Sequence, residues 1–185
     1  TSGNVSTPTL NLTMNACNLD VSNAPGAKVI YAKTGVTGAI DFEKTTVTTS
    51  GVNVIEDGDM TLSIDKDSKF YHGETQSVAL VDGVQYSGLD DAISAVNGKT
   101  SDTAMHLVQD VTRASQIEIN VEGNQSGTIT INGSGHTLTG DFEDGGDAHF
   151  IYFEKHLGTV NLNNLTIEHK NTDKNLMTFW RAIAR

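Results

Sequence analysis

Acidic side chains gather in one glycine-containing segment, DFEDGGD at residues 141–147. Ca²⁺ is a hard cation that takes several oxygen ligands, and carboxylates on a tightly wrapped loop can supply them. The acids of this segment form the predicted calcium site: Asp141, Glu143, Asp144 and Asp147. Their spacing does not match the full pattern of a helix–loop–helix calcium site, so solvated loop acids are the alternative. Calcium is the only cofactor that the sequence suggests.

Two further sets of residues could contact ligands. Trp180 stands beside Arg181, and an exposed aromatic ring with a neighbouring cation suits the face of a sugar. The alternative is that Trp180 packs within the protein. His149, His156 and His169 lie near one another in the sequence, but their spacing is not that of a metal site, and we interpret them as surface histidines.

A local pattern recurs along the chain: apolar, any, apolar, two residues, then apolar, any, apolar. Copies occur at residues 160–167 (VNLNNLTI), 12–19 (LTMNACNL), 40–47 (IDFEKTTV) and, with a longer break, 129–138 (ITINGSGHTL). The period of two within each half predicts a short strand with one buried face. The two-residue break predicts a corner between strands. Cys17 takes the place of Leu165 in this alignment, which indicates a small core residue.

Further short strands are expected at residues 29–32, 52–55, 60–64, 150–153 and 176–180. Three short strands per repeat predict an all-β fold of the parallel β-solenoid type, and an antiparallel β-sandwich is the alternative. The expected organisation is solenoid coils over residues 1–70, a linker with a capping helix and first strands over 71–116, and further coils over 117–185.

The segments ITINGSGHTLTG and TVNLNNLTIEH resemble coils of right-handed parallel β-helices of the pectate-lyase type. In such coils a corner asparagine can stack in a ladder, and Asn15 and Asn163 occupy matching corners, while Glu43 interrupts the series. The resemblance implies a fold but specifies no activity, because the same fold carries lyases, hydrolases and adhesins. A lyase needs a base near Asp-bound calcium, and a hydrolase needs paired carboxylates. No arginine aligns with stacked acids, so no catalytic residue is predicted and a non-enzymatic function is favoured.

One helix is predicted near residues 87–97, with Ser87 as the cap, Asp90 and Asp91 in the first turn and Asn97-Gly98 as the stop. Its apolar residues fall on one face: Leu89, Ala92, Ile93 and Val96. A tyrosine and small residues precede this helix, and a strand ending in Asp-Val follows it. That order resembles the opening of bacterial and archaeal surface β-helices of the adhesin-like kind, in which the helix closes the amino-terminal end of the solenoid. Here it lies in the middle of the chain. The order therefore looks rotated, and we expect Arg185 to lie near a Thr1, either of a neighbouring copy or of the same chain.

Composition limits the partners. The formal net charge of −11 opposes binding to nucleic acid, and no apolar run is long enough to span a bilayer. The opening TSGNVSTPT is typical of the interior of a longer or processed product. The single cysteine excludes an internal disulfide framework. We predict an extracellular or cell-surface structural or adhesive module, one period of a tandem array or of a head-to-tail filament or sheath. A carbohydrate-active enzyme or a carbohydrate-binding module for cell-surface or host polysaccharide is the alternative.

Overall fold

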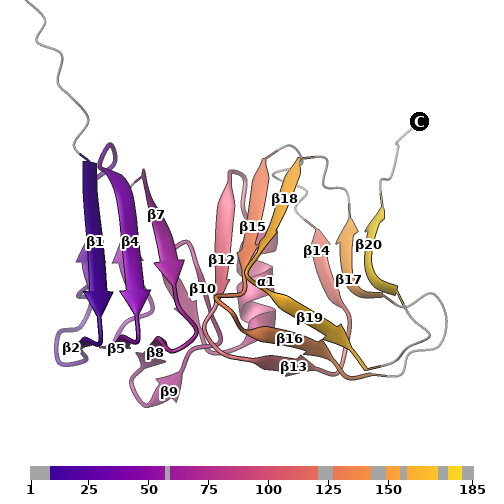
Figure 1. Cartoon of the computed structure of the whole chain (residues 1–185), viewed down its shortest axis with the longest axis horizontal. Coiled ribbons are helices and arrows are strands. Elements are labelled where there is room, and N and C mark those ends of the chain that lie inside the picture. Colours follow the sequence, from indigo (N-terminus) through magenta and orange to yellow (C-terminus); the bar gives the residue numbers. More distant parts are fainter. Residues whose placement is uncertain are drawn as a thin grey trace, which may run out of the picture.

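The protein is almost entirely β-structure, with one short helix (Figure 1). The computed structural model describes residues 9–56, 59–120, 127–142, 149–154, 158–170 and 175–180. Eleven strand pairs are parallel and three are antiparallel in this part of the chain. The predicted all-β class is confirmed, and the mostly parallel pairing does not fit the antiparallel sandwich that was the alternative.

The strands form two sets, which we call the first and the second stack. In both, strands pair in parallel with the equivalent strands of the next repeat, and β9 alone among them pairs antiparallel with its sequence neighbour β8. The first stack contains β1 (Thr9–Asn15), β4 (Thr37–Glu43) and β7 (Asp59–Ile64) in one sheet, β2 (Asn18–Val21), β5 (Thr46–Thr49), β8 (Lys69–His72) and β9 (Thr75–Gln76) in a second, and β3 (Ile30–Tyr31) with β6 (Ile55–Glu56) in a third.

The second stack repeats this arrangement with three parallel strands in each sheet, and a β-hairpin within residues 79–86 extends the first of these sheets. Its sheets contain β12 (Thr103–Leu107), β15 (Thr128–Asn132) and β18 (Thr159–Asn163), then β13 (Val111–Arg113), β16 (Thr137–Gly140) and β19 (Thr166–His169), then β14 (Ile117–Asn120), β17 (His149–Glu154) and β20 (Asn175–Trp180). We call each set of consecutive strands, one from each sheet, a rung. The first rung is β1–β3 and the last is β18–β20.

The predicted corners are confirmed between the first two strands of three rungs. Ala16, Lys44 and Asn164 stand at the same place in the repeat, with φ of 54°, 48° and 45°. This left-handed backbone redirects the chain within two residues, which explains the break in the apolar pattern. In the longer copy, Ser134 has the same conformation, with φ of 54°. The asparagine ladder does not extend through the first stack, because the amide of Asn15 donates to the Glu43 carboxylate at 2.6 Å.

The inward-facing side chains form one apolar cluster in each stack. The middle rungs are fully covered, so that Ile40, Val47 and Ile129 have no exposed surface. In the outer rungs the equivalent positions Leu12, Leu19 and Val160 are only half-buried. Each rung therefore protects its neighbours from water, and a rung with only one neighbour stays partly exposed.

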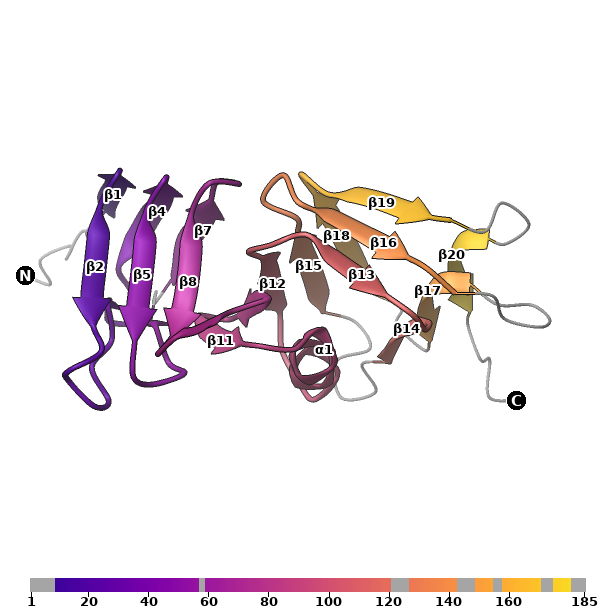
Figure 2. The same cartoon turned by 90° about the horizontal axis from the view of Figure 1, so that it is seen from below.

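Helix α1 (Leu89–Asn97) closes the inner end of the second stack. Leu89, Ala92, Ile93 and Val96 face the apolar cluster of that stack, as the sequence predicted. The prediction of Ser87 as the cap was wrong: Gly88 is the N-cap residue and no side chain bonds the first turn. The helix lies in the middle of the molecule in both views (Figures 1 and 2).

A β-hairpin joins the two stacks. Its strands are β10 (Ala79–Val81) and β11 (Val84–Tyr86), and its turn is Asp82-Gly83, with φ of 46° and 77°. Two positive φ values match the twist of a hairpin turn of type I′. Strand β10 pairs antiparallel with β12 of the second stack, while the Gly83 carbonyl accepts from the Val54 amide of the first stack at 3.0 Å.

The same hairpin closes the inner end of the first stack. Leu80 of β10 and Val108, which follows β12, belong to the apolar cluster of the first stack. Beside them the buried amide of Gln85 donates to the Thr49 hydroxyl at 2.6 Å and accepts from the Ser77 hydroxyl at 2.9 Å. These bonds satisfy a polar side chain that would otherwise destabilise this end of the core.

Replacing Gly83 tests whether this hairpin turn is essential. An added Cβ would lie 2.1 Å from the Ile55 carbonyl oxygen, whereas one at Gly26, with φ of 79°, would meet nothing. Gly26→Ala should cost about 1–2 kcal/mol of unfolding free energy from backbone strain alone. Gly83→Ala should cost clearly more, because it also separates the stacks. Urea unfolding measures both, and equal losses would contradict this role of the turn.

Candidate functional site

The predicted calcium site is not assembled by the described residues. Asp141 pairs with Lys170, its Oδ2 lying 2.5 Å from Nζ, and so links the segment after β16 to the segment after β19. Glu143, Asp144 and Asp147 lie outside the described residues. Within the described ranges there is no group of three or more metal-ligating side chains. The calcium site stays a prediction.

The predicted sugar-contacting pair also falls largely outside the structure. Trp180 is the last residue of β20, where it is the register partner of Glu154, but its side chain is not described. Arg181 lies outside the described residues, as do Arg185 and Thr1, which were expected to meet. The described chain therefore does not test these two expectations.

The two described histidines after residue 148, His149 and His169, have different partners. The ring of His149 is hydrogen-bonded through Nδ1 to the Thr178 hydroxyl at 2.9 Å. His169 packs edge-on against Phe142, with ring centroids 4.9 Å apart. His156 lies outside the described residues. His149 and His169 thus have separate roles in packing, and neither is half or more exposed.

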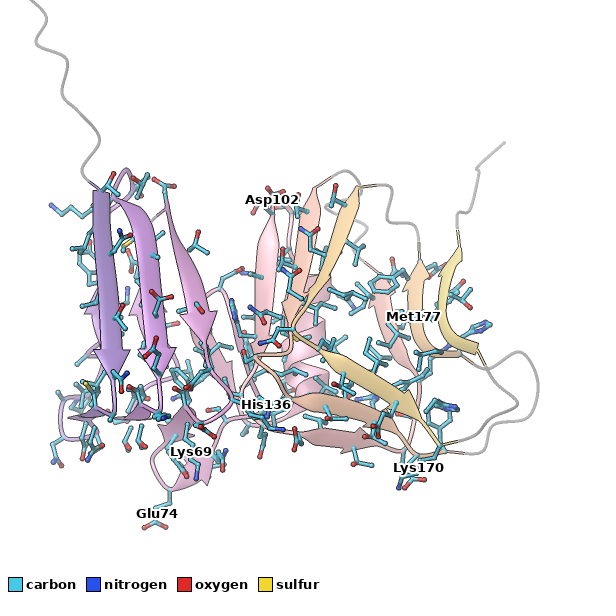
Figure 3. The ribbon with its side chains drawn as sticks, in the orientation of Figure 1. Lys69, Glu74, Asp102, His136, Lys170 and Met177 are labelled. Atoms are coloured by element: carbon cyan, nitrogen blue, oxygen red, sulfur yellow. The ribbon has the colours of Figure 1, made fainter. Side chains whose placement is uncertain are left out.

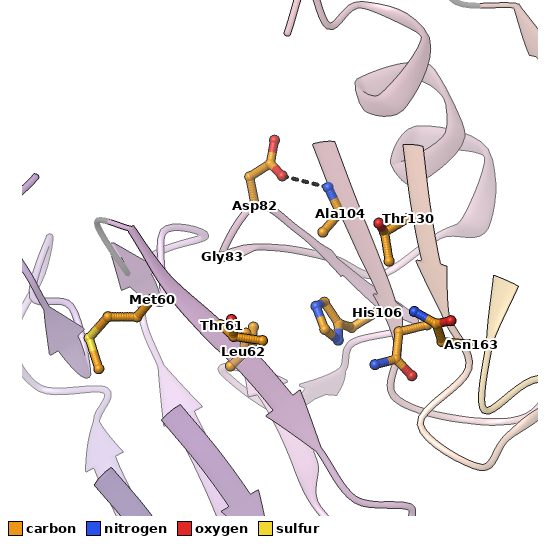
Figure 4. Close-up of a pocket in the computed structure, with 10 residues that line it drawn as sticks. Met60, Thr61, Leu62, Asp82, Gly83, Ala104, His106, Thr130 and Asn163 are labelled. Carbon is orange, nitrogen blue, oxygen red and sulfur yellow. Dashed lines mark hydrogen bonds between the residues drawn. The ribbon is translucent and has the colours of Figure 1, made fainter. Parts of the chain in front are cut away.

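A solvent-accessible groove lies between the two stacks, with a volume of about 470 Å³ (Figure 4). One wall is β7, and the other is the outer face of β12, β15 and β18 beyond the Asp82-Gly83 turn. The residues that line it are Met60, Thr61, Leu62, Asp82, Gly83, Ala104, His106, Thr130, Asn132 and Asn163. It forms because the hairpin pairs with only part of β12, which leaves the first residues of β7 and β12 apart.

His106 is the most distinctive side chain of this groove. It is only 5% exposed, and its Nδ1 has no hydrogen-bond partner among the described residues. Burial lowers its pKa to about 4, although the charge of Asp82 acts in the opposite direction. The imidazole is therefore neutral at neutral pH. His106, Asn132 and Asn163 are successive register partners on β12, β15 and β18, so polar side chains line up across the sheet.

Asp82 is already engaged by protein groups. Its Oδ2 lies 2.6 Å from the Lys99 ammonium, and its Oδ1 accepts from the Ala104 amide at 2.9 Å and from the Thr103 hydroxyl. This carboxylate bonds a backbone amide at the edge of β12, and the Lys99 ammonium balances its charge. Asp82 is the one acid among the residues that line this groove, so the groove can form hydrogen bonds with a neutral molecule. An overlapping pocket that shares Asp82 with it is also lined by Asp59 and Asp102.

His136 is a second buried histidine that was not among the candidate residues predicted from the sequence. The His136 ring donates from Nδ1 to the Asp110 carboxylate at 3.1 Å, and the Thr137 amide donates to the same carboxylate, which lowers the pKa of Asp110. The nearby Ser134 hydroxyl is buried and has no partner in the described part of the chain. Because both side chains are shielded from solvent, this group supports the corner and does not offer a nucleophile to a substrate.

The outer ends of the two stacks are the other candidate site. Among the described residues, no strand pairs with the outer edges of β1, β2 and β3, nor with those of β18, β19 and β20. In both views β1 lies at one end of the molecule and β20 at the other, while β18 lies nearer the middle (Figures 1 and 2). Core-type side chains are half-buried there: Leu12, Cys17, Leu19 and Ile30 at one end, and Val160, Leu162, Leu165, Ile167 and Met177 at the other. Cys17 thus lies at the margin of the core.

Comparisons with models of protein families, with curated proteins and with solved structures found no match. No described helix has the length and apolar character needed to cross a bilayer. The groove and the two outer ends are therefore the features from which a function can be argued.

His106 should make the protein sensitive to acid. Its pKa is lower in the folded state than the ordinary value of 6.5, so the unfolded chain binds a proton first as the pH falls. Stability should then be lost between about pH 6.5 and pH 4, by on the order of 3 kcal/mol. Urea unfolding at pH 7, 5.5 and 4.5 measures this loss. His106→Gln should flatten the dependence and His72→Gln should not, and equal slopes for all three proteins would contradict the assignment.

Proposed function

We propose that the chain is a right-handed parallel β-helix module of an extracellular structural or adhesive assembly, whose copies associate end to end. The observation that carries the proposal is the contrast between the ends of the stacks. The two inner ends are closed by α1 and by the β10–β11 hairpin, while both outer ends present strand edges and half-buried apolar side chains.

Open strand edges favour pairing with another chain. An edge strand presents a row of backbone donors and acceptors that can extend a sheet, and apolar side chains beside it gain from burial. Soluble proteins commonly protect such edges. Because the first and last rungs expose unlike edges, association through them is head to tail, and a head-to-tail contact that does not close on itself gives a filament rather than a dimer. Joined copies within one longer chain would use the same contact.

The groove supports carbohydrate binding as a second function. Its asparagine amides and threonine hydroxyls offer hydrogen bonds, while Met60 and Leu62 supply an apolar wall. Sugars combine polar groups with apolar faces, and neutral ones avoid the charge of −11. Lyase or hydrolase chemistry has less support, because Asp82 is held by Lys99 and by β12. Titration calorimetry with neutral oligosaccharides tests binding, and His106→Gln should weaken it.

End-to-end association predicts a specific effect of a charge at the outer end. Leu10 on β1 is 51% exposed, and Val52, which lies between β5 and β6 and away from both outer ends, is 46% exposed. Leu10→Asp should weaken self-association at least about tenfold, because burying a charge in place of leucine opposes contact. Val52→Asp should have little effect. Sedimentation velocity over a concentration series gives both values.

The native Cys17 provides a second readout of the same association. It is half-buried at the outer end, so its reaction with a thiol reagent should slow as copies associate. Filaments or short rods should be visible by negative-stain electron microscopy at high concentration. A protein that stays monomeric at every concentration, with Leu10→Asp indistinguishable from the parent, would contradict the proposed function.

A further inference from the structure

We propose that the contact between copies is a parallel, in-register strand addition, in which β18 and β19 of one copy pair with β1 and β2 of the next. Asn163 then lies beside Asn15, and the two corners are aligned. This inference rests on the proposed function, but it specifies which edges meet, in which direction and in which register. The partner is a second copy of this chain.

The corners indicate the direction of the contact. In the first stack the Thr46 amide donates across the corner to the Cys17 carbonyl of the preceding rung at 2.9 Å. In the second stack the Thr166 amide donates in the same way to the backbone carbonyl of His136 in the preceding rung at 3.2 Å. Every rung therefore has one side that faces its predecessor and one that faces its successor. The first and last rungs expose opposite sides, which fit head to tail.

The register follows from the shared corner conformation. Ala16 and Asn164 are the left-handed residues of the first and last rungs, with φ of 54° and 45°. Inside each stack, left-handed corners of adjacent rungs lie side by side, as the bond from the Ala16 amide to the Glu43 carbonyl at 2.9 Å shows. Continuing that geometry across the contact brings Ala16 of one copy next to Asn164 of the other. A shift by one residue would turn the apolar side chains outward.

The apolar side chains match in this register. Each inward-facing residue of β18 and β19 meets one of β1 and β2, and all but Met14 are half-buried in the single copy. The resulting pairs are Val160 with Leu12, Leu162 with Met14, Leu165 with Cys17 and Ile167 with Leu19. The contact therefore buries the side chains that the outer rungs leave partly exposed, as the middle rungs already do inside each stack.

The same register also sets a limit on the strength of the contact. It places Glu168 of β19 beside Asp20 of β2, and both side chains are exposed. Like charges on adjacent strands are destabilising, and the net charge of −11 adds a general repulsion. Association should therefore strengthen with salt, because both repulsions are screened.

Cysteine pairs test the register directly. Thr13 and Asn161 face outward on β1 and β18 and would be register partners, about 4.8 Å apart between Cα atoms. In a Cys17→Ser background, Thr13→Cys with Asn161→Cys should form disulfide-linked ladders under mild oxidation. The matched control is Asn11→Cys with Asn161→Cys. Its Cα atoms would lie about 8 Å apart, beyond the roughly 7 Å that a disulfide spans, so it should form few ladders.

The single variants separate this inference from the proposed function. Thr13→Cys alone would form dimers if copies met through their first rungs, and Asn161→Cys alone if they met through their last rungs. Ladders from the Asn11 pair, or dimers from either single variant, would overturn the register or the direction while leaving end-to-end association intact. An absence of crosslinks from every variant, together with a monomer in sedimentation, would overturn both.

The charge pair provides an independent test. Glu168→Gln removes the repulsion at the contact and should tighten association about two- to fivefold at low salt. Glu74→Gln removes the same charge from the turn between β8 and β9, away from both outer ends (Figure 3), and should have a smaller effect. Sedimentation at low and high salt compares them. Equal tightening by both substitutions would show that only net charge matters and would overturn the pairing of Glu168 with Asp20.

Discussion

An apolar core built from stacked rungs has two ends, and each end must be covered by something. Within each stack the covering is supplied by the next rung, which is why Ile40 and Ile129 are fully buried. At the inner ends it is supplied by two unrelated elements, helix α1 and the β10–β11 hairpin. The free energy gained by excluding water from these side chains favours closure wherever a suitable surface is available. The two outer ends are the places where the described chain supplies none.

The short left-handed corner makes this stacking regular. It turns the chain within two residues while keeping the inward positions of both strands on the same face, so that successive rungs can superimpose. It also gives the rungs a direction, because the two sides of a rung make different backbone bonds at the corner: the Ala16 amide donates to Glu43 of the next rung, and the Thr46 amide donates to Cys17 of the rung before. A stack made this way has unlike ends. That asymmetry, more than any single side chain, makes head-to-tail association the geometry that continues the existing pattern.

The repeat could be predicted from the sequence because each strand carries its own period of two and each corner its own break. The apolar face of α1 was equally clear, since Leu89, Ala92, Ile93 and Val96 alternate with polar residues at helical spacing. The prediction of Ser87 as the helix cap was wrong because the next residue, Gly88, takes the N-cap position without a side-chain hydrogen bond. These features depend on neighbours in the chain, and local physical chemistry determines them.

The groove could not be predicted, because it depends on how far the hairpin covers β12. His106 lies between Met105 and Leu107, so alternation does place it on the outer face, but only the tertiary arrangement shows that this face is enclosed by β7. The same is true of the Asp82 carboxylate, whose partners Lys99 and Ala104 lie 17 and 22 residues further along the chain. The acidic loop illustrates the reverse case: it has a clear composition, and its one described member, Asp141, is bound to Lys170.

Charge and apolar closure act in opposite directions at the outer ends. Proteins often guard exposed strand edges with charged residues, and here Asp20 and Glu168 are exposed on strands that form those edges. The apolar side chains beneath them favour contact over a short range. The acids oppose it over the Debye length, and their repulsion weakens as the ionic strength rises. In the proposed end-to-end contact, such an edge would associate reversibly rather than permanently, and the negative charge of the chain would set the ionic strength at which copies join.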